Sequence, residues 1–293
     1  MKIAISIPAY NEEKTIGNVI EDIKKIMSHT KYEYKILVVD DGSKDNTVKI
    51  AKEKGAITYS HHKNLGLAET FKTEIERCLE LGVDIIVHTD ADGQYPAKEI
   101  PKLITNVEEG YDLVLGARFG KGKYNGSFMK KIGNVAFARV FSKLLRTKIT
   151  DTTTGFRAFT SEVAQLPLIN DFTYTQEQLI RAGKAKMKIK EVPIKANKTR
   201  SSRLFKNSLD YALKAWVNIF RIYRDFEPLR FFVRIGLMFV FVGFLLGSFI
   251  LYRILTIGSA GGIPRVILSM LLILVGIQIV LFGFLADMMN RLK

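Results

Sequence analysis

Apolar runs alternate with amphipathic segments along the first 118 residues of the chain. Short apolar runs bounded by turn residues predict strands, whereas apolar side chains at helical spacing predict helices. The expected strands are Ile3–Pro8, Tyr34–Val39, Ala56–Ser60, Asp84–Thr89 and Asp112–Gly116. The expected helices between them are Glu12–Met27, Asp45–Lys54, Leu65–Leu81 and Pro96–Glu109. This order predicts an α/β fold with a mostly parallel, Rossmann-like sheet flanked by helices.

The pattern becomes less regular from Phe128 onward. It predicts helices at Phe128–Leu145 and around Gln176–Ala182, and strands at Phe156–Phe159 and Met187–Ile194. We therefore expect residues 1–203 to form one globular domain, which is an ordinary domain size.

Two uncharged apolar runs, Ile235–Tyr252 and Val266–Ala286, follow near the C-terminus. Each is close to the roughly 20 residues that a membrane-spanning helix needs. Residues 231–293 are therefore expected to hold two transmembrane helices, at about 233–254 and 265–287, joined as a hairpin. Two buried core helices are the alternative, although neither run has a polar face to show water. Gly243 and Gly247 form a Gly-x-x-x-Gly pattern, which predicts a homo-oligomer through the hairpin.

The net charge of +15 indicates a nucleic acid, an anionic lipid or a phosphorylated substrate as a partner. Residues 204–230 combine basic side chains with apolar ones at helical spacing, as in a helix that lies in the lipid headgroup plane. The alternative is a helix packed on the globular domain. No ribonucleoprotein, zinc or helix-turn-helix pattern accompanies the charge, so no nucleic acid is expected.

Basic residues also predict the orientation in the membrane. The outer ends of the two apolar runs have more basic residues, among them Arg230, Arg234 and Arg291. The loop between the runs has Arg253 and Arg265. The positive-inside rule then puts the large domain on the cytoplasmic face. We expect a multi-pass protein, in the plasma membrane of a prokaryote.

Polar side chains gather where three of the expected strands end. Ala9-Tyr10-Asn11-Glu12 follows the first strand, Asp40-Asp41-Gly42-Ser43 the second and Asp90-Ala91-Asp92-Gly93-Gln94 the fourth. In open α/β sheets, ligands bind beyond the carboxyl ends of the strands. The three clusters therefore predict one binding crevice.

Asp90 and Asp92 are spaced so that both carboxylates can approach one cation at a loop bend. Gln94 adds a third oxygen. An oxygen-only set with two carboxylates suits Mg²⁺ or Mn²⁺, with water and substrate phosphates completing the shell. A solvated turn is the alternative, but the position after an apolar strand favours a metal site.

The motifs together resemble glycosyltransferase family 2, which has the GT-A fold. The matching segments are Pro8-Ala9-Tyr10-Asn11-Glu12, Val39-Asp40-Asp41-Gly42-Ser43, Asn64-Leu65-Gly66, Asp90-Ala91-Asp92-Gly93-Gln94, Gly116-Ala117-Arg118 and Thr154-Gly155-Phe156-Arg157. Within the family the chain looks most like polyprenyl-phosphate sugar synthases, such as dolichyl-phosphate mannose synthase. The features that indicate this group are Gln94, Asp151–Arg157, Glu177, the strand Glu191-Val192-Pro193-Ile194 and the hairpin.

The resemblance implies roles for the donor-side residues. Those implied to bind the nucleotide sugar, a GDP- or UDP-sugar, are Pro8, Ala9, Tyr10, Glu12, Asp40, Asp90, Ala91 and Asp92. Those implied to bind the metal and diphosphate are Asp90, Asp92 and Gln94. Asp41 and Ser43 are interpreted instead as caps of the helix at Asp45–Lys54.

On the acceptor side, the resemblance assigns the lipid phosphate to Arg118, Lys131 and Arg203. The candidate cations as a whole are Arg118, Lys131, Arg157, Arg200 and Arg203. The residues implied to be catalytic are Asp92, Arg118, Asp151 and Glu177. Asp151 has a second interpretation, as a turn cap ahead of the threonine run. Asn197 and Arg200 depart from the family's usual arginine and glycine.

The predicted function is metal-dependent transfer of a sugar, with inversion, from a nucleotide-diphosphate sugar to a polyprenyl phosphate such as dolichyl or undecaprenyl phosphate. One alternative is a family 2 transferase that acts on a hydroxyl of a glycolipid or polysaccharide, which needs a positioned base. Another is an inactive membrane adaptor that keeps the fold for protein contacts.

Overall fold

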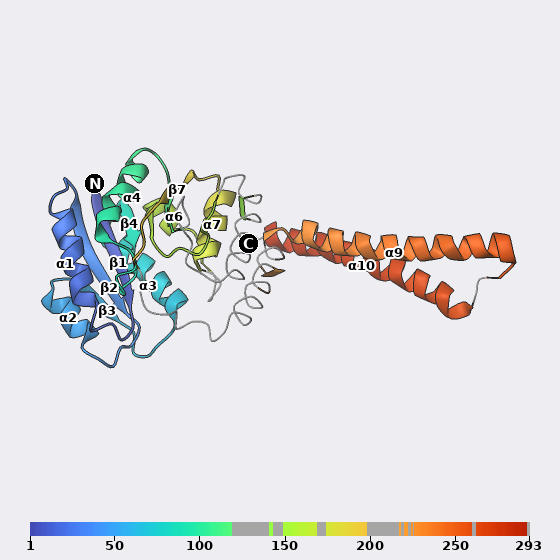
Figure 1. Cartoon of the computed structure of the whole chain (residues 1–293), viewed down its shortest axis with the longest axis horizontal. Coiled ribbons are helices and arrows are strands. Elements are labelled where there is room, and N and C mark those ends of the chain that lie inside the picture. Colours follow the sequence, from blue (N-terminus) through green and yellow to red (C-terminus); the bar gives the residue numbers. More distant parts are fainter. Residues whose placement is uncertain are drawn as a thin grey trace. The chain divides into compact units, whose positions relative to one another are not determined.

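The structure is a computed structural model, and it describes residues 1–118, 141–142, 149–168, 174–197, 217, 220–221, 224, 226–259 and 262–291. The chain divides into two compact units, Met1–Leu213 and Lys214–Lys293 (Figure 1). Most of the helix expected at Phe128–Leu145 and most of the interfacial helix expected within residues 204–230 lie outside the described residues.

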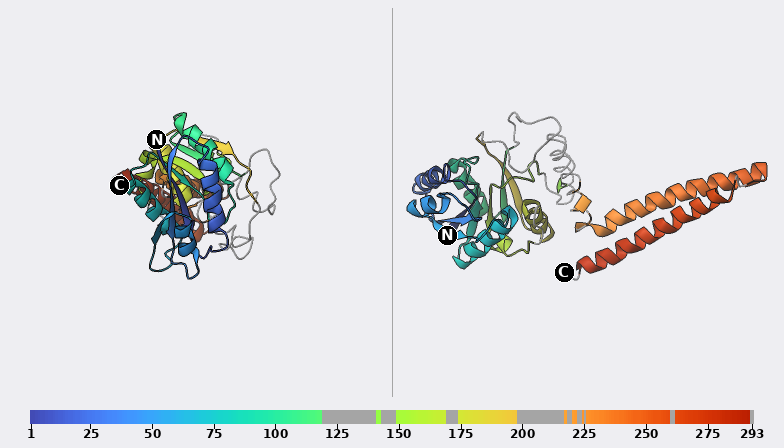
Figure 2. Two further views of the ribbon diagram at one scale, coloured as in Figure 1. Left: turned by 90° about the vertical axis from the view of Figure 1, so that its left-hand side faces the viewer. Right: turned by 90° about the horizontal axis from the view of Figure 1, so that it is seen from below.

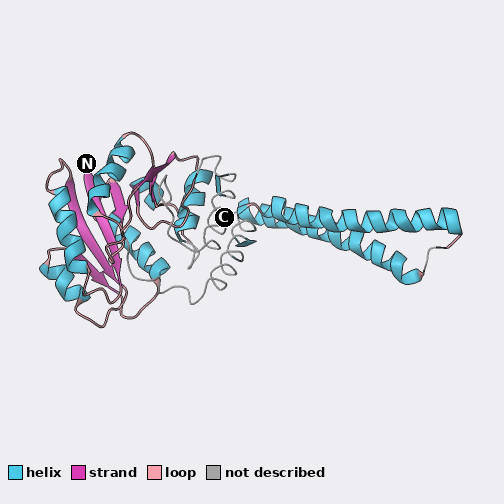
Figure 3. Ribbon diagram, viewed as in Figure 1, coloured by secondary structure: helices cyan, strands magenta, loops and turns pink. Residues whose placement is uncertain are grey.

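The first unit is built on a seven-stranded sheet, and every strand expected from the sequence is confirmed. The strands are β1 (Lys2–Ala9), β2 (Glu33–Asp40), β3 (Ile57–Ser60), β4 (Ile85–His88), β5 (Leu113–Ala117), β6 (Arg157–Thr160) and β7 (Ile189–Pro193). Their order across the sheet is β3-β2-β1-β4-β6-β5-β7. Helices cover the strands on both sides (Figure 3).

The helices of the first unit follow the expected alternation closely. They are α1 (Ile16–Met27), α2 (Thr47–Glu53), α3 (Leu67–Glu80), the 3₁₀ turn η1 (Ala97–Glu99), α4 (Ile100–Glu108), α6 (Ser161–Ala164) and α7 (Tyr174–Lys184). α1 and α4 pack their apolar stripes onto one face of the sheet, in a single core cluster with Ile3, Ile5 and Ile7 of β1. α3 contacts β1 and β2 from the other face (Figure 1). Covered on both faces, β1 is almost entirely buried, as a parallel strand usually is.

The sheet is parallel except for β6, which runs antiparallel to both of its neighbours, β4 and β5. Its backbone pairs Arg157 with His88 on one side and with Leu115 on the other. The strand alternation alone did not predict this direction, because a strand after an irregular segment can enter the sheet either way. The short helix α6, which follows β6 directly, was also not predicted from the pattern.

The described part of the second unit is dominated by two long helices. α9 (Pro228–Ile257) and α10 (Ile263–Arg291) are long and apolar enough to cross a membrane, and both extend beyond the spans expected from the sequence. They lie side by side as a hairpin, which Figure 1 and the right-hand view of Figure 2 show. The turn between them begins at Gly258, which has a left-handed φ of 70°.

A seam of small residues brings the two helices into contact. A methyl group built on Gly236 would lie 2.5 Å from the Gly276 carbonyl oxygen, and one on Gly276 would lie 2.7 Å from the Gly236 oxygen. Ser269 Oγ donates a hydrogen bond of 2.8 Å to the Gly243 carbonyl oxygen. Gly236 and Gly243 are a heptad apart, as are Ser269 and Gly276, which is the spacing of a left-handed helix pair. Gly243 and Gly247 thus face α10 of the same chain, although the sequence suggested a contact with a second copy.

Replacing Gly276 by alanine should destabilise the hairpin. The new methyl group would meet backbone atoms of α9, the Gly236 oxygen and Val240 N at 2.7 and 2.8 Å, and backbone yields little. Overpacking of this kind typically costs about 1–3 kcal/mol. Loss of helical signal in detergent micelles titrated with SDS would measure the effect.

Gly247→Ala is the matched control for this substitution. Its methyl group would meet Ser269 Oγ, at 3.0 Å, and no backbone atom of α10, so the serine side chain can turn at the cost of its one hydrogen bond to the Gly243 oxygen. We expect a much smaller shift. Equal shifts for the two variants would mean that the glycine seam does not set the separation of the helices.

Candidate active site

The carboxyl ends of β1, β2 and β4 lie together at one edge of the sheet. β1 and β2 are in register, so Ala9 pairs with Asp40, and Ser6 of β1 pairs with His88 at the end of β4. The three polar clusters that follow these strands are therefore brought together, as their positions in the sequence predicted.

The loops after β1 and β2 are fastened to each other by hydrogen bonds. The Asn11 amide donates to Ser43 Oγ at 2.8 Å, and the Lys44 amide donates to Asn11 Oδ1 at 2.9 Å. The Glu12 amide donates to Thr47 Oγ1 at 2.8 Å. Asn11 has a φ of 53°, in the left-handed region that asparagine tolerates better than most residues. The two loops thus form one wall of the site.

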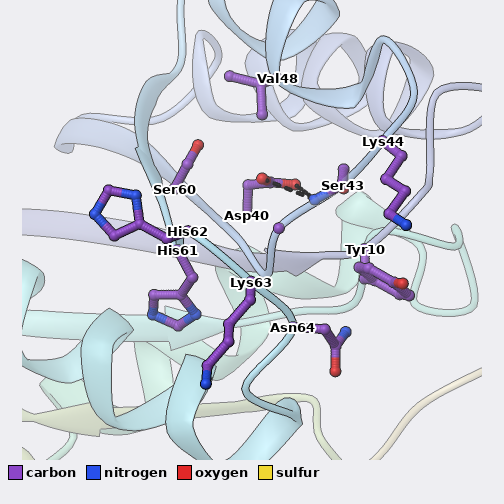
Figure 4. A pocket seen from close by; sticks show the side chains of 11 residues that line it. Tyr10, Asp40, Ser43, Lys44, Val48, Ser60, His61, His62, Lys63 and Asn64 are labelled. Carbon is purple, nitrogen blue, oxygen red and sulfur yellow. Dashed lines mark hydrogen bonds between the residues drawn. The ribbon is translucent and has the colours of Figure 1, made fainter.

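This wall borders a cavity of about 580 Å³. Its lining residues are Tyr10, Asp40, Gly42, Ser43, Lys44, Val48, Ser60, His61, His62, Lys63 and Asn64, drawn in Figure 4. Asp40 is held at its base, where its carboxylate accepts a hydrogen bond of 3.1 Å from the Ser43 amide. The volume is in the range of small-molecule sites. Tyr10 and Asp40, both predicted to bind the nucleotide, line it.

Asp41 fastens the opposite wall of this cavity. Its carboxylate accepts hydrogen bonds from the amides of Leu65 and Gly66, at 2.8 and 2.9 Å. It also lies 2.9 Å from Nδ1 of His61, whose other ring nitrogen is 3.0 Å from Thr73 Oγ1. Asp41 thereby holds the loop that leads into α3.

The interpretation of Asp41 and Ser43 as helix caps was wrong. The residue before α2 is Asn46, whose side chain makes no capping hydrogen bond, and the Thr47 amide donates to Asp45 Oδ1 at 3.0 Å. Both side chains are taken up instead by loops distant in sequence, Asp41 by residues 61–66 and Ser43 by Asn11. The same side-chain oxygens can cap a helix or accept hydrogen bonds from a distant loop, so the sequence alone did not distinguish the two roles.

Asp90 and Asp92 lie in the loop after β4. Asp92 Oδ1 accepts the Gln94 amide at 2.9 Å, which bends the loop. In the part of the chain that the structure describes, no donor forms a hydrogen bond with the Asp90 carboxylate. Burial raises the pKa of Asp90 to about 6; His88 and Arg118 oppose the rise and Asp92 adds to it.

Gly155 makes room for the Asp90 carboxylate. A methyl group built at this position would lie 3.2 Å from Asp90 Oδ1 and 3.7 Å from His88 Nε2. The segment leading into β6 therefore approaches the carboxylate with its bare backbone. This explains why a glycine suits the Thr154-Gly155-Phe156-Arg157 motif at this point.

A buried pair of titratable side chains lies behind Asp90. His88 and Glu74 are both fully buried, and His88 Nδ1 lies 2.7 Å from Glu74 Oε2. Phe71 and Tyr174 pack around the imidazole ring. The pair was not predicted from the sequence. The feature that could have indicated it is a histidine at the end of an otherwise apolar strand.

The donor set fits a hard divalent cation. Asp90 is a partly buried carboxylate that accepts no hydrogen bond from the described residues, and Asp92 adds a second negative charge beside it. Within the described residues no group of three or more His, Cys, Asp and Glu side chains could hold a metal. A site with only two carboxylates and an amide is what Mg²⁺ uses when water and substrate phosphates complete its shell. Asp90, Asp92 and Gln94 therefore suit a metal that arrives with a phosphorylated ligand.

Arg118 follows β5 and is held by Asp151. Its Nε donates to Asp151 Oδ2 at 2.8 Å and its Nη2 to Asp151 Oδ1 at 3.0 Å. Nη2 also donates to Thr153 Oγ1 at 3.0 Å. The Asp151 side chain is fully buried, while that of Arg118 is 23% exposed. A bidentate pair of this kind fixes the plane of the guanidinium group.

The structure confirms one of the two interpretations of Asp151, that of a turn cap. Its Oδ1 accepts hydrogen bonds from the Thr153 amide and hydroxyl, at 3.3 and 3.2 Å, so it also caps the turn of the threonine run. Glu177 is similarly occupied: fully buried on α7, it pairs with Arg181 one turn later, at 2.7 Å. Whether either residue takes part in catalysis stays a prediction.

Arg157 does not serve as an exposed cation. The side chain is fully buried, and it donates to the carbonyl oxygens of Thr154 and Thr175 and to Gln178 Oε1. Burial lowers the pKa of Arg157 to about 10. Its expected role among the phosphate-binding candidates was therefore wrong, because its donors hold the loop before β6 against α7.

Asn197, which follows β7, forms hydrogen bonds with the loop after β4 that contains Asp90 and Asp92. Its backbone amide donates to the Gln94 carbonyl oxygen at 2.8 Å and its side-chain amide to the Gly93 carbonyl oxygen at 3.1 Å. This contact accounts for one departure from the family pattern, since an asparagine is short enough to bond the loop directly. Lys131, Arg200 and Arg203, the other predicted cations, lie outside the described residues.

Comparison with known proteins agrees with this geometry. Residues 4–166 match the model of the family described as "Glycosyl transferase family 2". The chain is 34% identical to a UDP-N-acetylglucosamine–dolichyl-phosphate N-acetylglucosaminyltransferase of Methanococcus voltae, over 68% of this chain and 87% of that protein. It is 35% identical to a dolichyl-phosphate hexose transferase of Haloferax volcanii, over 66% and 81% of the two chains.

A solved structure shares the fold. The glucosyl-3-phosphoglycerate synthase of Mycobacterium tuberculosis, crystallised with Mn²⁺, uridine diphosphate and phosphoglyceric acid, superposes with a TM-score of 0.59. The match covers 76% of this chain and 77% of that one, at 20% identity. The expected GT-A fold is thereby confirmed.

Gly155→Ala should weaken metal binding. The added methyl group would press on Asp90 Oδ1 at 3.2 Å, and the carboxylate would have to turn away. We expect the affinity for Mn²⁺, measured by electron paramagnetic resonance with a nucleoside diphosphate present, to fall on the order of tenfold or more, as for a strain of 1–3 kcal/mol.

Gly17→Ala, which makes the same change on α1, is the control and should bind Mn²⁺ like the wild type. Wild-type affinity in Gly155→Ala, with the thermal stability unchanged, would argue that the Asp90 carboxylate does not contact the metal.

Proposed function

The chain belongs to glycosyl transferase family 2, and on that premise we propose that it transfers a sugar from a nucleoside-diphosphate sugar to a polyprenyl phosphate, with inversion at the anomeric carbon. The Methanococcus voltae and Haloferax volcanii relatives are named as transferases that act on dolichyl phosphate. The observation that carries the proposal is the Arg118 guanidinium, fixed by Asp151 and electrostatically coupled to Asp90. A rigid cation beside a metal-type carboxylate suits a reaction between two phosphate-bearing molecules.

The acceptor chemistry needs little base catalysis. A monoalkyl phosphate has a second pKa of about 6, so its oxygen is already largely anionic at neutral pH. Asp151 and Glu177, the predicted catalytic acids outside the Asp-x-Asp loop, are both fully buried and bound by arginines. Neither offers a free carboxylate to deprotonate a hydroxyl. This supports a phosphate acceptor over the hydroxyl of a glycolipid or polysaccharide.

On the donor side, we assign the nucleoside to the cavity that Tyr10 and Asp40 line, and the diphosphate to Asp90 and Asp92 in the loop after β4. A divalent cation, when bound there, would neutralise charge that develops on the leaving diphosphate. Gln94 and the two aspartates would hold that cation. Pro8, Ala9, Glu12 and Ala91 do not line the cavity, and their contact with the nucleotide stays a prediction.

Arg118 holds the acceptor phosphate close to the anomeric carbon. Bringing two polyanions together is the main electrostatic difficulty, and a preorganised arginine reduces it without reorganising during the reaction. We propose that Asp151 acts by orienting Arg118, and that Lys131 and Arg203 add charge to the same phosphate site. One displacement without a covalent intermediate inverts the configuration.

We propose that α9 and α10 span the membrane and keep the catalytic domain next to its lipid acceptor. The excess of arginine at the outer ends of the hairpin supports a cytoplasmic position of that domain. A UDP- or GDP-sugar is the donor, and a homo-oligomer remains a prediction.

Purified protein in detergent should move label from one member of a panel of UDP- and GDP-sugars into an organic-soluble lipid. The reaction should require polyprenyl phosphate and should stop with EDTA, since both the acceptor charge and the metal are needed. Metal-dependent nucleotide binding without any transfer to polyprenyl phosphate would contradict the proposal and favour a hydroxyl acceptor. Failure to bind any nucleotide sugar would favour an inactive adaptor.

Asp92→Ala should lower transfer by at least about 10²–10³-fold, the usual effect of removing one group that stabilises transition-state charge. Asp22→Ala, which removes an exposed aspartate of α1, is the control and should leave the rate unchanged. Near-normal turnover of Asp92→Ala without metal would refute the metal site.

A further inference from the structure

Glu191 is a carboxylate in the middle of β7, and its hydrogen bonds all go to one short segment. Both of its oxygens lie 2.9 Å from the Thr150 amide, and Oε2 accepts the Thr150 hydroxyl at 2.8 Å. Oε1 accepts the Asp151 amide at 2.7 Å. A charged acceptor with three donors is a strong anchor, because hydrogen bonds to an ionised group are about twice as strong as neutral ones.

The segment that Glu191 holds includes the carboxylate that orients Arg118. Asp151 accepts hydrogen bonds from Nε, Nη2 and the backbone amide of Arg118, and from Thr153. Its side chain is fully buried, so it cannot reorient through solvent. The direction of the guanidinium group therefore depends on where the backbone at Asp151 is held.

The two ends of this chain of contacts lie on neighbouring strands. β5 and β7 are parallel partners, with Leu115 opposite Glu191 and Ala117 opposite Pro193. Arg118 follows Ala117 at the end of β5. The contacts from Glu191 through Asp151 to Arg118 thus close a ring on the sheet itself, and a rigid support of this kind is what a preorganised cation needs.

We propose that Glu191 is a positioning residue that aims the Arg118 guanidinium at the acceptor phosphate, acting through Thr150 and Asp151. Glu191 touches neither substrate. The inference rests on the proposed function, because it assigns Arg118 to the acceptor. Its effect should therefore appear in the use of the lipid phosphate and not in the binding of the nucleotide sugar.

Glu191→Gln keeps the shape of the side chain, removes its charge and turns one acceptor into a donor. We expect the KM for polyprenyl phosphate to rise on the order of ten- to hundredfold, as when a hydrogen-bond network to a charged group is broken. The affinity for the nucleotide sugar with metal should stay within about twofold, since no donor-side residue contacts Glu191.

Glu109→Gln is the matched control, because Glu109 is an exposed carboxylate paired with Lys190, the residue next to Glu191 on β7. It should leave both constants unchanged. Equal loss of donor and acceptor affinity in Glu191→Gln would overturn the proposal, since a general structural defect has that signature.

A double-mutant cycle tests whether Glu191 acts through Arg118. In an Arg118→Ala background, Glu191→Gln should change the acceptor KM by less than about twofold, because the group it positions is gone. Full additivity of the two effects would overturn the proposal. Thr150→Val removes one hydroxyl donor to Glu191 and should give a smaller rise in the same KM, which covers the case that Glu191→Gln fails to fold.

Amide hydrogen exchange separates this proposal from the proposed function. The Thr150 and Asp151 amides should be protected in the wild type and should exchange faster in Thr150→Val and Glu191→Gln, whatever the acceptor. No transfer to polyprenyl phosphate by the wild type, with this protection intact, would contradict the proposed function alone. Normal transfer by the wild type with an unchanged acceptor KM in both variants would contradict the positioning role alone.

Discussion

The first unit is organised around a partly buried carboxylate, Asp90, for which the described residues supply no hydrogen-bond donor. Isolating a charge from water costs several kcal/mol unless a counter-charge compensates it. Asp90 carries this cost at the end of β4, and its raised pKa reflects it. Gly155 gives the carboxylate room, and His88 and Arg118 supply positive potential beside it. His88 lies at the end of β4, Arg118 follows β5 and Gly155 precedes β6, so the sheet brings together the groups that surround this carboxylate.

Elsewhere in the site the acidic residues are satisfied by the protein itself. Asp41 accepts hydrogen bonds from the loop before α3, Asp151 pairs with Arg118, and Glu177 pairs with Arg181 on the same helix. The contrast separates carboxylates that build the walls from those that face a ligand. Among the acidic residues of the described site, Asp90 is the one whose carboxylate accepts no hydrogen bond, which is why we propose the Asp-x-Asp loop as the metal site.

Much of the fold could be predicted from the sequence, because apolar periodicity reports directly on strands and helices. The site clusters could be predicted for the same reason, since strand ends in a parallel sheet share one edge. The partners of Asp41, Arg157 and Asn197 could not. Each has several stereochemically suitable partners, and which one it meets depends on how loops distant in sequence approach each other. The direction of β6 has the same origin, because it depends on pairing with β4 and β5 at once.

The place of β6 in the sheet also has a consequence for how the chain is made. β5 pairs only with β6 and β7, and both are synthesised after it. A nascent chain that has emerged only as far as Ala117 therefore has β5 without a ladder and β4 with an open edge. Unpaired edges invite association with other chains. The β4 edge closes once β6 has been made, through Thr160, and the second edge of β5 closes only with β7, through Pro193. These edges therefore stay open while the later strands are being synthesised.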